Sequence, residues 1–483
     1  MSFKRELGLF DSTMIVAGSM IGSGVFLVSA DIARSVGSPG MLLVVWLVTG
    51  LLTMIAALSY GELAGLLPHA GGQYVYLREA FGPLAGFLYG WTLFTVIQTG
   101  TIAAVAMAFA KYTSAVFPGV GETHILISLG GFSINAAQAF AILSIIALTA
   151  LNARGVSLGK LVQNTFTSTK IVSVVALATA GIVYGLSNGT LSTAFGSLWT
   201  DGVSAAVPLL SPDQQTSFGF ASRYGMPLLA IVAVSMVGSV FSSDAWNNIT
   251  FAASEVKSPE RTIPRALVLG VALVTALYLL TNLAYIAVMP IGGSPDASTA
   301  FGRGIAFATN DRVGAAAADV IFGPSGGLIM AVLIMISTFG CNNGIILSGS
   351  RAYYAMANDG MFFRKAATLN RNGAPAASLW MQAVWASALC LSGKYGDLLD
   401  YVVFAVLIFY VLTILGIFRL RSTRPDAPRP IKAVGYPVLP ALYIVLALTI
   451  CICLLIYKPN YSWPGLLIVA SGVPVYMVWR SRR

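Results

Sequence analysis

The sequence predicts an all-α membrane protein with about twelve transmembrane helices. Of the 483 residues, 57% are hydrophobic and 10% are charged, and the mean hydropathy is +0.81. Soluble globular domains carry about 25% charged residues. The apolar residues gather in runs of about 20 residues, the length that crosses a bilayer. Two of these runs are interrupted at mid-depth by glycine and serine.

Twelve apolar segments are long enough to be predicted as spans. Their expected limits are 10–35, 40–66, 84–117, 133–152, 159–186, 224–252, 264–289, 325–356, 376–393, 397–418, 436–457 and 463–480.

The net charge of +10 indicates membrane topology rather than nucleic-acid binding. With the N-terminus placed inside, most lysines and arginines fall on the cytoplasmic side. The outer side receives only Arg34, Lys111, Arg223, Arg303, Arg312, Lys394 and Lys458. This positive-inside pattern predicts a multi-pass protein of the inner or plasma membrane with both termini in the cytoplasm.

Several function classes lack support in the sequence. The four cysteines fall in predicted spans, and two histidines in loops cannot form a metal cluster by themselves. No P-loop, zinc-protease or nucleophile-elbow pattern occurs. We therefore expect no enzyme activity, no catalytic residue, no metal and no cofactor.

The first span is predicted to be a broken helix. Residues 18–24 contain three glycines and two serines, and each interior glycine costs about 1 kcal/mol relative to alanine. Lipid offers no partner for a freed backbone group, so a break persists where it is buried in protein or lines a cavity. The alternative is close helix packing through small residues.

A second break is predicted in the sixth span, at residues 238–244. Breaks in spans one and six predict two five-helix repeats of opposite orientation, with a ligand where the broken helices meet. The expected units are a first repeat (1–187), an outer loop (188–223), an inverted second repeat (224–420) and two additional helices (421–483). A second outer loop, 291–323, is expected to hold a short surface helix, and both loops could act as lids or simply tolerate insertion.

The first break is predicted to bind a zwitterion. Amides at the start of the outer half-helix suit a carboxylate, and carbonyls from Ala17 to Ser19 suit an ammonium group. An α-amino acid meets both demands. The amides are those of Ile21, Gly22, Ser23 and Gly24.

The sixth span supplies Val240, Phe241, Ser242 and Asp244 as further candidate substrate-binding residues. Phe241 is interpreted as a gate over the ligand, with plain core packing as the alternative. A charge at membrane depth is costly, which favours a function for Asp244. It could bind a substrate amine, carry a coupling proton or cap a half-helix.

Three other spans contribute candidates. Lys170 in span five shares a helical face with Gln163 and Thr167, and the freed carbonyls of span one are its expected partners; the alternative is a lysine that reaches the cytoplasmic surface. In span eight, Cys341 and Asn343 line the site or join helices. Glu62 and Glu255 near the cytoplasmic face are expected to form inner-gate ion pairs or to lie at solvated helix ends.

Together these residues resemble the amino acid–polyamine–organocation (APC) superfamily, in its L-amino acid transporter branch. The resemblance covers nearly the whole chain. Four motifs carry it, at residues 18–26, 60–74, 244–265 and 343–360. It implies a leucine-transporter-type fold of five plus five inverted helices, with the substrate carboxylate on the first break, the amino group on carbonyls of spans one and six, and Phe241 as the aromatic gate.

The resemblance also implies a mechanism. Lys170 matches a lysine that replaces sodium in sodium-independent relatives, which favours amino acid exchange without sodium. Proton-coupled symport and transport of cationic amino acids or polyamines remain alternatives, as does a sensor or channel on the same scaffold. Eukaryotic members often pair with a heavy chain through an outer-loop cysteine, and residues 118–132 contain none, so a disulfide-linked heavy chain is not expected.

Overall fold

A computed structural model describes residues 3–129, 132–203, 226–392 and 395–481. Within these residues, nine helical segments are long and apolar enough to cross a membrane, and three shorter apolar helices accompany them. The predicted all-α, multi-pass membrane fold is confirmed.

The helices follow the predicted spans closely. The first part of the chain forms α1 (Leu9–Met20), η1 (Gly24–Phe26), α2 (Ser29–Val36), α3 (Pro39–Leu66), α4 (Gln73–Phe81), α5 (Pro83–Thr92), the π-helical η2 (Leu93–Ile97), α6 (Gln98–Val116), η3 (Pro118–Val120), α7 (Ala136–Ala153), α8 (Val156–Ser187) and α9 (Thr190–Gly196).

The remainder forms α11 (Leu228–Ser242), α12 (Asn248–Phe251), η6 (Ala253–Glu255), α13 (Pro259–Val288), α14 (Ala300–Arg303), η7 (Thr309–Asp311), α15 (Val313–Phe322), η8 (Gly323–Ser325), α16 (Gly326–Asn358), η9 (Arg364–Ala367), α17 (Ala376–Leu391), α18 (Tyr395–Thr423), α19 (Val438–Tyr457) and α20 (Pro459–Ser481).

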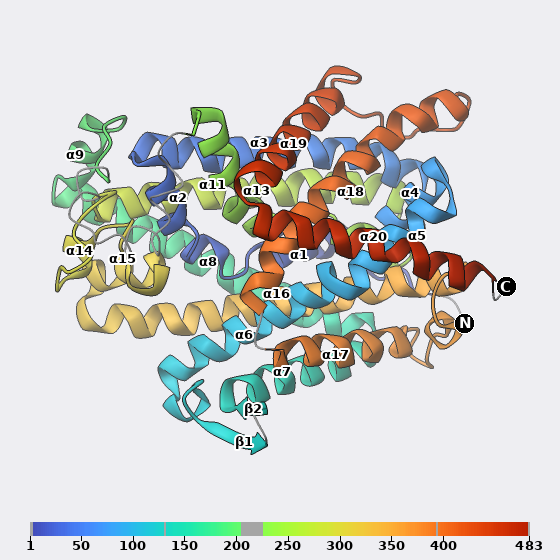
Figure 1. Ribbon diagram of the computed structural model, residues 1–483, viewed down its shortest axis with the longest axis horizontal. Helices are drawn as coiled ribbons and strands as arrows, with labels where there is room; N and C mark the ends of the chain where they lie inside the picture. The colour runs from blue at the N-terminus through green and yellow to red at the C-terminus, as the bar shows by residue number, and fades with distance from the viewer. Residues whose placement is uncertain (1–2, 130–131, 204–225, 393–394, 482–483) are drawn as a thin grey trace.

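The helix α1 lies near the centre of the bundle (Figure 1). It packs against three long helices, α8, α13 and α16. With 12 residues it is too short to cross a hydrocarbon core of about 30 Å alone. The chain continues through η1 and α2, so the first span is a broken helix.

The two termini lie at the same end of the molecule, and α9, α14 and α15 lie at the opposite end (Figure 1). This arrangement agrees with an even number of crossings. Residues 291–323 hold α14, η7 and α15, as expected of a loop with a surface helix.

The fourth span was expected to begin at residue 133, but the helix begins at Ala136. The residues before it form β2 (Phe132–Asn135), which pairs with β1 (Ile125–Leu129) in an antiparallel hairpin. The second break begins at Ser243 rather than at Gly238, because α11 stays helical through Ser242. Gly238 instead allows a close helix contact, since a Cβ there would lie 2.9 Å from the Cβ of Val28.

Candidate functional site

The break after α1 leaves three consecutive amides without a partner. The Ile21 amide donates to Ala17 O (3.0 Å), and the Gly22 amide donates to Met20 O (2.9 Å). Among the described residues, no oxygen accepts from the next three amides, those of Ser23, Gly24 and Val25. The free donors therefore begin two residues later than the sequence indicated, at the start of η1.

The carbonyls of the same break all have donors from the protein. The Lys170 ammonium, on α8, donates to Gly18 O (2.6 Å), Ile21 O (2.8 Å) and the Ser337 carbonyl of α16 (3.4 Å). Its three protons are thus used, and the side chain is 1% exposed. The alternative of a lysine at the cytoplasmic surface is wrong.

The carbonyls near Ala17 are likewise not free for a substrate ammonium group. Ala17 O accepts from the Ile21 amide, and Ser19 O accepts from the Cys341 thiol at 3.0 Å. The Ser337 hydroxyl lies 2.9 Å from Gly22 O and adds a further donor. Polar side chains of α8 and α16 therefore hold this backbone open.

The second break runs from Ser243 to Asn247, where Ala245 adopts a left-handed backbone with φ of 63°. Among the described residues, no donor contacts the carbonyl oxygens of Ser243 or Asp244. The two breaks touch each other, since a Cβ on Gly24 would overlap the side chain of Ser242. The stretch that carries the free amides thus contacts Ser242, the residue directly before the free carbonyls.

Tyr278 of α13 ties the two broken helices together, and the sequence argument missed it. Its hydroxyl lies 2.9 Å from both Met20 O and Ser242 O. Asn282 and Tyr285 follow on the same face, bonded to Ser29 Oγ (2.6 Å) and Val25 O (3.3 Å). The three residues recur at spacings of four and three, and this pattern in the sequence could have indicated a polar face that includes Tyr278.

Replacing Tyr278 with phenylalanine is expected to slow transport about tenfold while the protein still folds, because the lost hydrogen bond is worth about 0.5–1.5 kcal/mol. Tyr285→Phe, which removes a longer bond from the same helix, is the matched control and should have a smaller effect. Transport rates in proteoliposomes give the comparison. Equal losses in both variants would contradict a specific role for the Tyr278 hydroxyl in joining the two broken helices.

Asp244 lies at the second break and forms no ion pair with a described residue. The Tyr410 hydroxyl donates to its Oδ1 at 2.6 Å. Both residues line a cavity of about 20 Å³, enough for a water molecule, together with Gln73 and Asn247. The N-cap of α12 is Asn247, so Asp244 does not cap that helix.

Phe241 lines a different cavity, of about 320 Å³, which it shares with Asp31 and Lys458. These two residues belong to the side that the charge pattern places outside. Val240 is partly buried against the core, and its carbonyl oxygen accepts from the Ser243 amide at 3.1 Å. Phe241 therefore lies between this cavity and the second break.

The α16 candidates divide into two groups. Cys341 is next to the first break, with its sulfur 3.5 Å from the position of a Cβ on Gly22. Asn343 does not contact α1; it bonds to Asn152 (2.9 Å) and to Gln163 (3.0 Å). Gln163 in turn donates to Met14 O at 3.2 Å, so Asn343 acts on α1 through this amide network.

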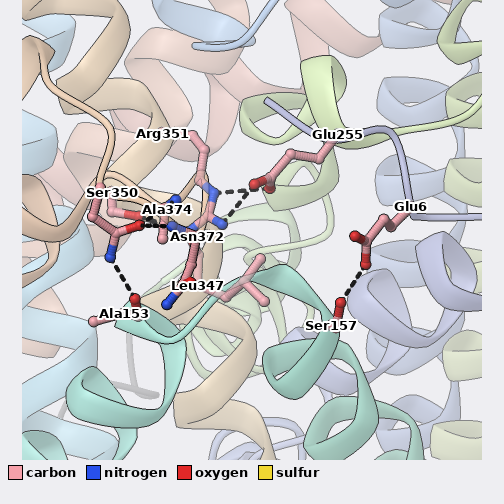
Figure 2. Close-up of polar contacts among 10 residues, drawn as sticks. Glu6, Ala153, Ser157, Glu255, Leu347, Ser350, Arg351, Asn372 and Ala374 are labelled. Atoms are coloured by element: carbon pink, nitrogen blue, oxygen red, sulfur yellow. Dashed lines mark hydrogen bonds and ion pairs between the residues drawn. The ribbon is translucent and has the colours of Figure 1, made fainter. Parts of the chain in front are cut away.

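Buried ion pairs close the end of the molecule that carries the termini. Arg351 forms two bonds with Glu255, at 2.9 and 3.0 Å, and both side chains are almost fully buried. Figure 2 shows this pair beside the contact between Glu6 and Ser157. The Leu7 amide also donates to Glu255 O at 3.0 Å, which holds the N-terminal segment against the same residue.

Glu62 forms a second buried cluster. It pairs with Arg421 (2.6 Å) and Arg429 (3.3 Å) and accepts from the Ala433 amide at 2.7 Å. Nearby, partial burial of Glu79 opposes its ionisation, but hydrogen bonds from Arg424 and Arg78 lower the pKa of its carboxyl below the usual value. Neither Glu62 nor Glu255 lies at a solvated helix end, since each is 1% exposed.

Replacing Arg351 with leucine is expected to destabilise the protein by about 3–5 kcal/mol, because Glu255 is left as an uncompensated buried charge. Arg421→Leu is the matched control: Glu62 keeps Arg429 and the Ala433 amide, so the loss should be smaller. Thermal unfolding in detergent measures both; an unchanged midpoint for Arg351→Leu would contradict the assignment.

Comparison with known proteins agrees with this geometry. A family model described as amino acid permease matches residues 7–479. The chain is 28% identical to the mouse b(0,+)-type amino acid transporter 1, over 99% of this chain and 88% of that protein. It is also 28% identical to the mouse large neutral amino acids transporter small subunit 2, over 99% of this chain and 81% of that protein. With broken helices at its centre and a match over nearly its whole length, the chain belongs to the amino acid permease family of the APC superfamily.

Proposed function

We propose that this protein is a secondary transporter that exchanges α-amino acids across the cell membrane without sodium, by alternating access. The observation that carries the proposal is the run of free amides at Ser23, Gly24 and Val25. Successive amides at a half-helix N-terminus bind a carboxylate. The substrate ammonium group then lies toward the free carbonyls of Ser243 and Asp244.

The proposed inverted repeats are 1–187 and 224–420, joined by the outer loop 188–223 and followed by two helices in 421–483. The positions of the two broken helices, α1 and α11, support this division. Residues 204–225, which include part of the loop and most of the segment before α11, lie outside the described residues. Rocking of one repeat against the other would open the central site alternately to each side.

Lys170 supports a sodium-independent mechanism. Its ammonium group bonds to carbonyls of α1 and α16, and oxygen ligands of this kind are what a bound cation needs. The lysine thus supplies a fixed positive charge at that place. Phe241 is proposed as the gate on the outer side, and Glu62 and Glu255 as parts of the inner gate.

The relatives give the chemical class of the substrate. The names of both relatives describe amino acid transporters, which agrees with the proposed zwitterion-binding geometry. A second candidate is a preference for cationic amino acids or polyamines, favoured by the carboxylate of Asp244, which accepts from the Tyr410 hydroxyl but forms no ion pair with a described residue. Asp244→Asn should then weaken competition by arginine and leave competition by leucine unchanged.

We further propose that the protein lies in the inner or plasma membrane with both termini in the cytoplasm, and that it works without a disulfide-linked heavy chain. The four cysteines are all buried, so none is available for such a link. If this is right, the chain expressed alone should transport; a strict requirement for a second subunit would contradict it.

Uptake of a radiolabelled amino acid mixture into sodium-free proteoliposomes tests the mechanism. We expect uptake only into vesicles that are preloaded with unlabelled amino acids, at either of two external pH values. Uptake into empty vesicles that rises at acid pH would establish proton symport instead, with Lys170 or Asp244 as the candidate proton carrier. No uptake under any condition would contradict amino acid transport.

A further inference from the structure

A second polar cavity lies at the end of the molecule opposite the termini. It has a volume of about 390 Å³ and is lined by residues of α6, α14, α15 and the start of α16. Its charged and aromatic lining residues are Tyr112, Arg303, Arg312 and Asp319. The volume falls in the range of small-molecule sites, about 300–1,000 Å³.

Within the part of the chain that the structure describes, three hydrogen-bond donors at this cavity have no hydrogen-bond partner. Tyr112 is 3% exposed, and its hydroxyl is buried without a hydrogen bond. The Nε of Arg303 is also buried and unpaired, although Nη1 of the same side chain donates to Ala297 O at 2.7 Å. The guanidinium of Arg312 stacks over the Tyr112 ring, 5.4 Å from its centroid, and forms no hydrogen bond with a described residue. The Tyr112 hydroxyl and the Arg303 Nε are thus buried donors without a partner, which are costly and rare.

The charge pattern makes this cavity unusual. The outer side of the protein is depleted in basic residues, yet two of its seven lysines and arginines line one cavity. Guanidinium groups bind carboxylates through paired hydrogen bonds. Arg312 also directly precedes the first turn of α15, where the helix dipole favours an anion.

Asp319 provides the complementary charge. Its Oδ1 accepts from the Gly327 amide at 2.6 Å, and among the described residues its other oxygen has no partner and neither arginine forms an ion pair with it. One cavity therefore presents two arginine cations, the Tyr112 hydroxyl and the Asp319 carboxylate. Neither arginine forms an ion pair with this carboxylate.

We propose that this cavity is a second, outer binding site for a zwitterionic α-amino acid, with Arg303, Arg312 and Tyr112 on the carboxylate and Asp319 on the ammonium group. The assignment rests on the proposed function, because its ligand is the substrate of the central site.

Protection of an introduced cysteine tests the site without measuring transport. Ala315 lines the cavity, and the four native cysteines are buried, so Ala315→Cys adds an accessible thiol. A water-soluble methanethiosulfonate reagent should label it about tenfold more slowly when glycine is present at ten times its dissociation constant. Glycine is the probe because it is the smallest α-amino acid. Acetate should protect less, and methylammonium should not protect.

Two controls make the result specific. Arg312→Gln or Arg303→Gln in the same background should abolish protection by glycine. Ala194→Cys places a thiol in a neighbouring cavity of about 380 Å³, which no charged side chain lines among the described residues, and its labelling should not respond to glycine.

The possible outcomes separate the two proposals. Equal labelling of Ala315→Cys with and without glycine would overturn the outer site, even in a protein that transports amino acids. Equal protection by acetate and glycine would overturn the role of Asp319. Protection by glycine in a protein that transports no amino acid would support the outer site while contradicting the proposed function.

Discussion

Replacing Lys170 with alanine is expected to reduce amino acid exchange by about two orders of magnitude, because a misplaced site backbone can cost about a hundredfold in rate. The substitution removes the Lys170 donor from Gly18 O and Ile21 O. Ile21 O keeps the Ser337 hydroxyl at 3.1 Å, but the carbonyl of the buried Gly18 is left unsatisfied. Such a carbonyl costs about 1–3 kcal/mol, so the backbone should rearrange and displace the amides of Ser23 to Val25. Exchange in preloaded proteoliposomes measures the loss.

Lys111→Ala is the matched control, since Lys111 is an exposed lysine on α6 and should be dispensable. A monodisperse elution profile and an observable unfolding transition would show that Lys170→Ala still folds. Wild-type exchange kinetics in a folded Lys170→Ala protein would contradict the proposed role of the lysine.

Replacing Gly24 with valine is expected to abolish substrate binding. A Cβ at this position would overlap the Ser242 side chain and lie 3.3 Å from Ser242 Cα. Backbone cannot yield as a flexible side chain does, so valine forces η1 and the end of α11 apart where the two breaks meet. Equilibrium binding of a transported amino acid should fall below detection.

Gly22→Ala is the control for this variant. A Cβ on Gly22 meets only the Cys341 sulfur, at 3.5 Å, which is an ordinary contact, so binding should be weakened slightly or not at all. The reverse order, in which Gly22→Ala abolishes binding and Gly24→Val retains it, would place the ligand elsewhere.

The broken first helix and the partners of Lys170 could be predicted from the sequence for physical reasons. Glycine and serine are unfavourable inside a membrane helix, so their cluster in residues 18–24 indicates a break. A lysine at mid-depth needs oxygen acceptors, and the break supplies them. The span limits followed from hydropathy alone, apart from the end of the helical part of span six.

Other features depended on three-dimensional packing. Gly238 looked like part of a break, but it serves a close contact with Val28. Which amides are free was decided by the local turn at Ile21 and Gly22, whose donors fold back onto Ala17 and Met20. No residue pattern specifies such a turn.

Tyr278 shows a different limit. The spacing of Tyr278 and Asn282 indicates a polar face of α13, but the sequence does not show that the Tyr278 hydroxyl meets two carbonyls that lie far apart along the chain. The roles of Arg303, Arg312 and Asp319 were hidden for the same reason, because only the fold of residues 291–323 brings them to one cavity.

The central claim is that the substrate carboxylate binds to the first break. An experimental structure with a transported amino acid bound tests it most directly. We predict carboxylate oxygens within about 3 Å of the amide nitrogens of Ser23, Gly24 and Val25, with the ammonium group toward Ser243 and Asp244. An amino acid whose carboxylate lies away from these amides, in a structure with an intact first break, would contradict the account.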